Sequence, residues 1–249
     1  MTSLAIISVT LLFVFFTSLL SGVIGMAGGM VLMAFLGSFF SVPVAMVVHG
    51  WTQAFANGYR SFLSRRHIRW DYAGLYILGL FVAYGLFELV AFKPTRQVVF
   101  FFLGLLPLVT FFKVNKTRWI TIESHFGRFI CGLFVQVTQL LAGASGPLLD
   151  IFFQNSSLNR HEIVATKGLF QTIGHIAKIL YFLPLLDASA RATFPDWFFV
   201  AAIILSGLGT QAGKVVLDRL SDIQFRKYSR WAILCVGIVC LYKAITITS

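Results

Sequence analysis

Apolar segments long enough to cross a lipid bilayer recur along the whole sequence, and they constrain its fold more than any other feature. A membrane-spanning helix needs about 20 mostly apolar residues. The sequence predicts such helices at roughly 4–24, 43–63, 70–91, 96–113, 125–142, 161–183, 196–217 and 228–247. Helices satisfy their backbone hydrogen bonds internally, as a bilayer requires. We therefore expect an all-α polytopic membrane protein.

These segments leave no room for a separate soluble domain. The loops between them are short, so residues 1–249 are expected to form a single transmembrane domain. Composition agrees, because only 12% of the residues are charged, against about 25% in soluble domains. Residues 4–24 have neither the basic start nor the cleavage site of a signal peptide, so we expect them to form the first membrane helix.

The net charge of +11 does not indicate a nucleic-acid partner. Lysine and arginine lie in several short loops rather than in one patch, and in such loops they orient membrane helices. Cys131, Cys235 and Cys240 fall inside predicted helices, at a spacing that matches no metal motif. We expect no metal, no cofactor and no catalytic residue, and therefore no enzyme.

The sequence "GMAGGM" at 25–30 is echoed by "GASGPL" at 143–148, which indicates an internal duplication. An offset of 118 residues pairs Gly25 with Gly143, Gly28 with Gly146, Gly50 with Gly168, Gln53 with Gln171 and Arg60 with Lys178. The paired glutamines are the most informative, because an amide inside a membrane helix is costly unless something uses it. We expect two homologous repeats, at about 1–113 and about 125–249.

The basic loops predict that the repeats are inverted. Three loops are expected in the cytoplasm on the strength of Arg60, Arg65, Arg66 and Arg69, then Lys113, Lys116, Arg118 and Arg128, and finally Lys214, Arg219, Arg226, Lys227 and Arg230. The 184–195 loop has little positive charge and is expected outside. Helix 43–63 and its mate 161–183 would then run in opposite directions, as in many secondary transporters. Lys93 and Arg96 would lie outside, against the rule.

Each glycine passage follows a full helix and precedes a short apolar piece, 28–40 or 146–154. We expect a helix break there, because unwound backbone in a membrane survives where it is buried in protein or lines a wet cavity. The half-helix after the break would present free N–H groups to an anion. The backbone residues expected at this site are Gly25, Gly28 and Gly29, and Gly143, Ser145 and Gly146. The alternative is close helix packing through small residues.

The next helix of each repeat carries a polar stripe. The stripes are His49, Gln53, Asn57 and Arg60, and Lys167, Gln171, His175 and Lys178. Each set falls within an arc of about 80°, and neither contains an acid, so we expect an anion path. Lys167 has no visible acid partner and is the residue expected to recognise charge, with the histidines as candidate proton carriers. The alternatives are that Lys167, Arg60 and Lys178 reach the headgroups, and that the histidines are ordinary interior residues.

Several stretches resemble the TauE/SafE sulfite exporter family over nearly the whole chain. They are the run "GASGPLLDIFFQNSSLNRHEIVATKGLFQTIGHIAKILYF" (143–182), the ending "GLGTQAGKVVLDRLSD" (207–222) and the basic loop that closes on Trp70-Asp71. His49-Gly50-Trp51 departs from relatives, in which small hydroxyl residues are common. The resemblance implies a multi-pass carrier of the bacterial inner membrane for sulfite or another sulfur-containing anion such as an organosulfonate.

The leading hypothesis is thus a secondary transporter that exports or imports a small anion, with protons as a candidate coupling ion. No Walker motif is visible in the sequence, which argues against direct ATP drive. The alternative is a membrane-embedded accessory or assembly protein without transport activity of its own. The direction of transport, the identity of the anion and the oligomeric state stay open at this stage.

Overall fold

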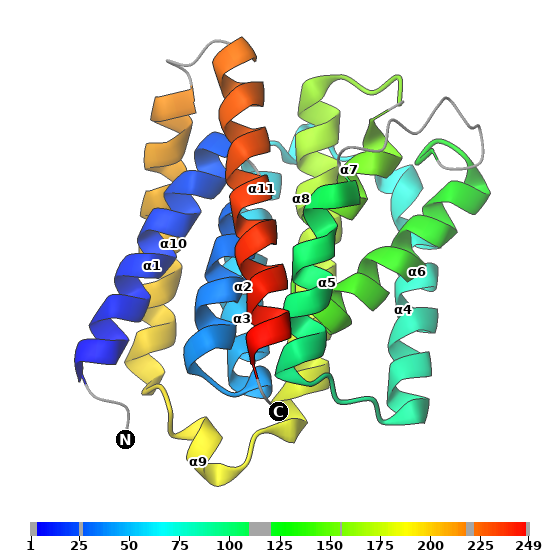
Figure 1. Ribbon diagram of the computed structural model, residues 1–249. Helices are drawn as coiled ribbons and strands as arrows, with labels where there is room; N and C mark the ends of the chain where they lie inside the picture. Colours follow the sequence, from blue (N-terminus) through cyan, green and yellow to red (C-terminus); the bar gives the residue numbers. More distant parts are fainter. Residues whose placement is uncertain (1–3, 25–26, 110–120, 155, 218–221, 248–249) are drawn as a thin grey trace.

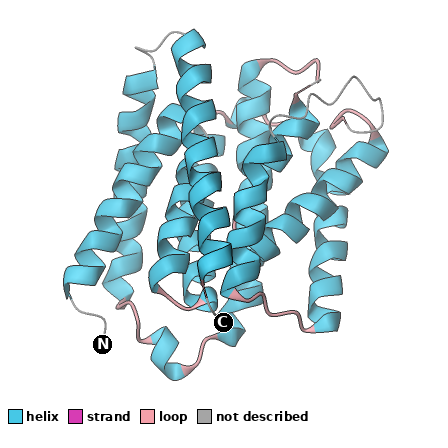
Figure 2. Ribbon diagram, viewed as in Figure 1, coloured by secondary structure: helices cyan, strands magenta, loops and turns pink. Residues whose placement is uncertain are grey.

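The computed structural model describes all residues except 1–3, 25–26, 110–120, 155, 218–221 and 248–249. Within the described residues the regular structure is entirely helical (Figure 2). The α-helices are α1 (Leu4–Ile24), α2 (Ala27–Phe39), α3 (Val42–Leu63), α4 (Ala73–Val90), α5 (Arg96–Val109), α6 (His125–Ala142), α7 (Gly146–Phe153), α8 (Arg160–Phe182), α9 (Ala188–Arg191), α10 (Asp196–Leu217) and α11 (Asp222–Thr246). Short 3-10 turns occupy Arg65–His67, Trp70–Tyr72 and Leu183–Leu185.

Three stretches in the described part of the chain are both long and apolar enough to cross a membrane, namely Leu4–Val23, Trp70–Val90 and Asp196–Val216. Shorter apolar helices cover Ala27–Phe39, Arg96–Leu108 and Leu234–Thr246. This is fewer than the eight apolar spans expected from the sequence. Helices α3 and α8 have the required length, but their polar side chains lower their hydropathy. Those side chains are buried inside the bundle, where His49, Gln53 and Gln171 are each less than a tenth exposed.

The helices pack mainly in four pairs that join distant parts of the chain (Figure 1): α1 with α10, α3 with α8, α4 with α6, and α5 with α11. Glycines allow the closest approaches. A Cβ on Gly79 of α4 would overlap the Phe129 carbonyl oxygen of α6, and one on Gly132 of α6 would overlap the Tyr76 carbonyl oxygen. Each glycine therefore lets the backbone of the partner helix come into contact, as small residues do in membrane bundles.

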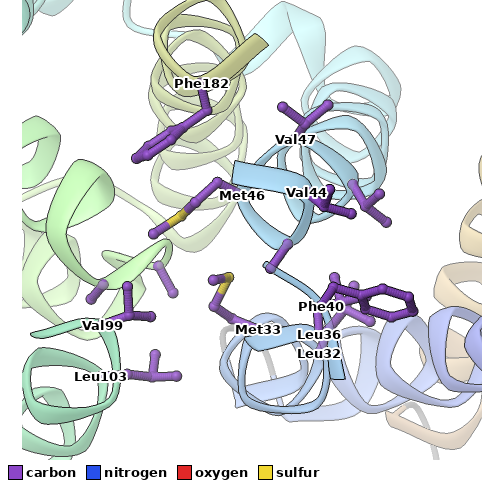
Figure 3. Packing of buried hydrophobic residues seen from close by; sticks show 14 of the residues in the cluster. Leu32, Met33, Leu36, Phe40, Val44, Met46, Val47, Val99, Leu103 and Phe182 are labelled. Carbon is purple, nitrogen blue, oxygen red and sulfur yellow. The ribbon is translucent and has the colours of Figure 1, made fainter. Parts of the chain in front are cut away.

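An apolar cluster fills the space between these pairs. Figure 3 shows Met33 of α2, Met46 of α3, Val99 and Leu103 of α5, and Phe182 of α8 converging on it. All five side chains are at most 1% exposed, so none of them lies on the surface of the bundle. Met46 and Phe182 lie seven residues, about two helical turns, from Gln53 and His175, on the same faces of α3 and α8 as the polar stripes. The cluster therefore continues those faces toward one end of the bundle.

The described loops gather at two opposite ends of the bundle. Residues 64–69 and 156–159 lie at one end, and residues 91–95 and 183–195 lie at the other (Figure 1). Helices α3 and α8 are antiparallel, because Gly50 packs against His175 and Ile179 whereas Gly168 packs against Asn57 and Ser61. Of the basic loops used for orientation, Lys113, Lys116, Arg118 and Arg219 lie outside the described residues.

This arrangement makes the orientation testable at Ser64 and Ser189, which lie at opposite ends. We expect a cysteine at Ser64 to react with an impermeant maleimide only when the cytoplasmic face is open, and a cysteine at Ser189 to react from outside. The background should carry Cys235→Ser, because Cys235 is the exposed one of the three natural cysteines. Labelling of both positions from the same side would contradict the orientation.

Candidate functional site

A narrow polar pocket of about 20 Å³ lies between α3 and α8, at the point where α1 and α2 and the start of α7 approach them. It is lined by Ser21, Gly29, His49, Gln53, Asn57, Arg60, Ala144, Ser145, Gly146, Gln171 and His175. The α3 contributors lie on one face of the helix and extend over about 16 Å of its axis. The lining contains hydroxyls, amides, imidazoles and one guanidinium, and no carboxylate.

Most of the predicted site residues meet in this pocket. They are Gly29, His49, Gln53, Asn57, Ser145, Gly146, Gln171 and His175. Gly25 lies outside the described residues. Gly28, Gly143 and Lys167 are described but lie elsewhere, each for a different physical reason given below.

His49 is held by contacts on both ring nitrogens. Its Nε2 lies 2.8 Å from the Gly29 carbonyl oxygen, which can only accept, so Nε2 carries the proton. Its Nδ1 then accepts from the Lys178 Nζ at 2.7 Å, and the same Nζ donates to the Gly143 carbonyl oxygen at 2.7 Å. Lys178 is 0% exposed. The interpretation that Lys178 extends to the headgroups is therefore wrong, because its stem runs inward to these two acceptors.

His175 is held by a second chain of hydrogen bonds. The Ser145 hydroxyl donates to the Gln139 Oε1 at 2.8 Å, and the Gln139 Nε2 lies 2.5 Å from the His175 Nδ1. Because the amide nitrogen can only donate, Nδ1 accepts and the His175 proton belongs on Nε2. The two imidazole rings lie 5.4 Å apart. Both histidines are thus fixed in orientation, and each has its proton on Nε2.

Two buried donors in the pocket have no hydrogen-bond partner within the described structure. They are the Nε2 of Gln53 and the Oγ of Ser21, in side chains that are 5% and 4% exposed. A buried donor left unpaired costs about 1–3 kcal/mol. The Arg60 guanidinium is half-buried beside them, and no hydrogen bond or ion pair engages it in the part of the chain that the structure describes. The pocket therefore presents hydrogen-bond donors that no described acceptor engages.

Lys167 is the main correction to the sequence analysis. It forms an ion pair with Asp150 of α7, so the expectation that it has no acid partner is wrong. The sequence places the two residues 17 positions apart on different helices, and only the turn between α7 and α8 brings them together. Their charges offset each other, which leaves Arg60 as the unpaired cation among the residues that line the pocket.

The glycines divide into packing and lining positions. Gly28 lies inside α2, and a Cβ there would overlap the Thr17 carbonyl oxygen and crowd Ser21 of α1. Gly143 ends α6 in the left-handed region with φ 76°, where glycine is favoured. Gly146 begins α7 with Pro147 directly after it, as suits the first turn of a helix. Gly28 thus permits helix contact, whereas Gly29 and Gly146 line the pocket.

Sequence reasoning missed Ser21, Gln139 and the role of Lys178. Ser21 lies one helical turn before the first glycine passage, and Gln139 one turn before the second. A search for polar residues one turn before each break would have found both.

The model of the sulfite exporter TauE/SafE family matches residues 10–240 of this chain. No curated protein and no solved structure matches it. The family match and the apolar helices together make the chain a multi-pass membrane protein.

We expect Gly28→Ala to lower the stability of the fold, by about 1–3 kcal/mol as overpacking typically does. The measurement is thermal unfolding of the purified protein in detergent, together with the folded yield. Gly85→Ala in α4 is the matched control, because no heavy atom lies within 4 Å of the added Cβ; it should be neutral or stabilising by up to about 1 kcal/mol. A Gly28→Ala protein of normal stability that fails to bind anions would instead support a lining role for Gly28.

Proposed function

The chain belongs to the TauE/SafE family of membrane transporters, and on that premise we propose that it is a secondary transporter of a small sulfur-containing anion, sulfite or an organosulfonate, in a bacterial inner membrane. The observation that carries the proposal is the pocket between α3 and α8. Its lining includes no carboxylate, and it combines a guanidinium with two buried donors that have no partner in the described part of the chain. Such a lining suits an oxyanion, which offers acceptors alone.

Two inverted repeats would form this pocket at their interface. The helix pairs support this, because α1 with α10 and α6 with α4 are equivalent pairs when the two halves are exchanged, and each pair joins the halves. The α3–α8 contact has the same property. Gly50 contacts His175 and Ile179. The residues at an offset of 118 from these three are Gly168, Asn57 and Ser61, and Gly168 likewise contacts Asn57 and Ser61. A twofold relation with an axis between α3 and α8 accounts for both observations.

The anion would lie within reach of Gln53, Ser21 and Arg60. Arginine presents several N–H donors in a planar fork that suits oxyanions, and hydrogen bonds to charged groups are among the stronger ones. His175 would add its Nε2–H, and the N-terminus of α7 at Gly146 would add the positive end of its helix dipole. The glutamines Gln53 and Gln171, which face the pocket from opposite repeats, would bind oxygen without adding net charge.

Transport would require this pocket to open to each side in turn. A volume of about 20 Å³ is roughly that of a site for one water, which is less than a sulfite ion needs. We propose that the structure represents a closed state, and that the halves rock about the fixed site as inverted-repeat transporters do. His49 and His175 are candidates for proton coupling, because imidazole changes charge near neutral pH. Export is the proposed direction.

The transport proposal is tested by uptake of labelled sulfite into liposomes that contain the purified protein. We expect saturable uptake, and we expect the Gln53→Leu, Gln171→Leu double variant to lose it while remaining folded, because leucine cannot replace either amide. Gel filtration and thermal unfolding serve as the folding controls. Absence of uptake of sulfite and of every sulfonate tried by the wild type would overturn the function; uptake retained by the double variant would remove only the glutamines.

We expect Arg60, rather than Lys167, to bind the negative charge of the anion. We expect Arg60→Gln to weaken sulfite binding by about 10- to 100-fold, which corresponds to the roughly 1.5–3 kcal/mol of a hydrogen bond to a charged group. Arg60→Lys should retain part of the affinity. Binding is measured by titration calorimetry in detergent.

Two controls isolate the effect of Arg60. Arg65→Gln removes an exposed cation just beyond the same helix, and Asp150→Asn with Lys167→Gln removes the ion pair without changing net charge. Both should bind almost as well as the wild type. A large loss in the Asp150, Lys167 double variant, with wild-type affinity in Arg60→Gln, would return the role to Lys167.

A further inference from the structure

A second, lateral groove is lined by residues of α2, α5 and α11, three helices that pack against one another and can be followed in Figure 1. Its volume is about 640 Å³, and it is lined by Ser38, Arg96, Ile238, Val239, Tyr242, Lys243, Thr246 and Ile247. It is separate from the polar pocket, with which it shares no residue. It lies at the end of the bundle that carries the 183–195 loop.

Two cations meet in this groove without a carboxylate partner in the described part of the chain. The Arg96 Nη2 donates to the Phe40 carbonyl oxygen at 3.1 Å. The Lys243 Nζ donates to the Ser38 hydroxyl at 2.5 Å and lies 5.5 Å from the centre of the Phe100 ring. These contacts fix the position of both groups but leave N–H donors of each unused.

The location of Arg96 is unfavourable on two general grounds. It is the first residue of α5, where the helix dipole disfavours a cation. It also lies at the end of the bundle for which the sequence predicts an external location, where basic residues are depleted. A negatively charged ligand beside Arg96 would offset both effects.

The remainder of the groove is mostly apolar and open to the surroundings. Ile238 and Val239 are 66% and 51% exposed, and they lie about one turn of α11 farther from the end of the bundle than Lys243. The groove thus has charged donors at the level expected for headgroups and an apolar surface toward the membrane interior. The Tyr242 side chain, 68% exposed, adds an amphipathic ring at the boundary.

We propose that this groove is a binding site for an anionic phospholipid, with its phosphate between Arg96 and Lys243 and an acyl chain along Ile238 and Val239. The charge balance of the chain favours a lipid over a second copy of the protein. Only 9 acidic residues stand against 20 lysines and arginines, so a second copy has few carboxylates to offer two cations. A lipid supplies both the charge and the apolar chain.

The test uses the full-length protein in a neutral detergent and compares phosphatidylglycerol with phosphatidylcholine of the same acyl chains. We expect phosphatidylglycerol to raise the unfolding temperature more than phosphatidylcholine does, and native mass spectrometry to show a retained phosphatidylglycerol. Arg96→Gln with Lys243→Gln should abolish the difference between the two lipids and weaken phosphatidylglycerol binding by about tenfold or more. Arg96→Lys with Lys243→Arg should preserve the difference.

Lys93→Gln is the matched control, because Lys93 is an exposed cation at the same end but outside the groove. It should behave as the wild type. The proposal is overturned if the wild type does not distinguish the two lipids, if Lys93→Gln loses the preference as fully as the double variant, or if soluble glycerol phosphate alone gives the full shift. A double variant that changes oligomeric state while keeping its lipid preference would assign the groove to a second copy.

Discussion

The buried ammonium of Lys178 imposes the strongest constraint on this bundle. A charge removed from water needs strong local partners, and breaking such an arrangement is costly. Among the described residues Lys178 has no carboxylate partner, and it relies on the Gly143 carbonyl oxygen and His49. The carbonyl is available because α6 ends there, and the C-terminal end of a helix carries the negative end of its dipole. The left-handed turn at Gly143 and the tautomer of His49 are therefore linked to one cation.

This constraint reaches the pocket through His49. With Nδ1 occupied by Lys178, the ring presents Nε2–H to the Gly29 carbonyl oxygen, which ties α3 to the start of α2. At the offset of 118 residues Lys178 corresponds to Arg60, which lies toward the opposite end of the antiparallel α3–α8 pair. Lys178 thus holds the second glycine passage in place, whereas Arg60 lines the pocket with no partner among the described residues. In our proposal this difference separates a structural role from a binding role at equivalent positions.

Periodicity within one helix was predictable, and contacts between helices were not. The stripe from His49 to Arg60 follows from 3.6-residue spacing, and its members do line one pocket. The pairing of Lys167 with Asp150 depends on the angle between α7 and α8, which no local pattern encodes. Likewise, Gly28 and Gly29 are adjacent and chemically identical, yet one faces the backbone of α1 and the other faces the pocket. Each of the eight predicted apolar segments coincides with a helix, but in the described residues α3 and α8 are not apolar throughout, because they direct their polar residues inward.

The excess of positive charge links the two proposed sites. With 9 acidic residues against 20 basic ones, most cations cannot be neutralised by carboxylates of the same chain, so a buried or half-buried cation without a carboxylate needs another kind of partner. Lys167 has Asp150, and Lys178 has the end of α6 and His49. Arg60 faces a polar pocket, and Arg96 and Lys243 face a groove open to lipid. A soluble anion bound to Arg60 and a phospholipid bound to Arg96 and Lys243 would give each of these cations an anionic partner. The soluble anion would reach its site from water, and the phospholipid would reach its site from the bilayer.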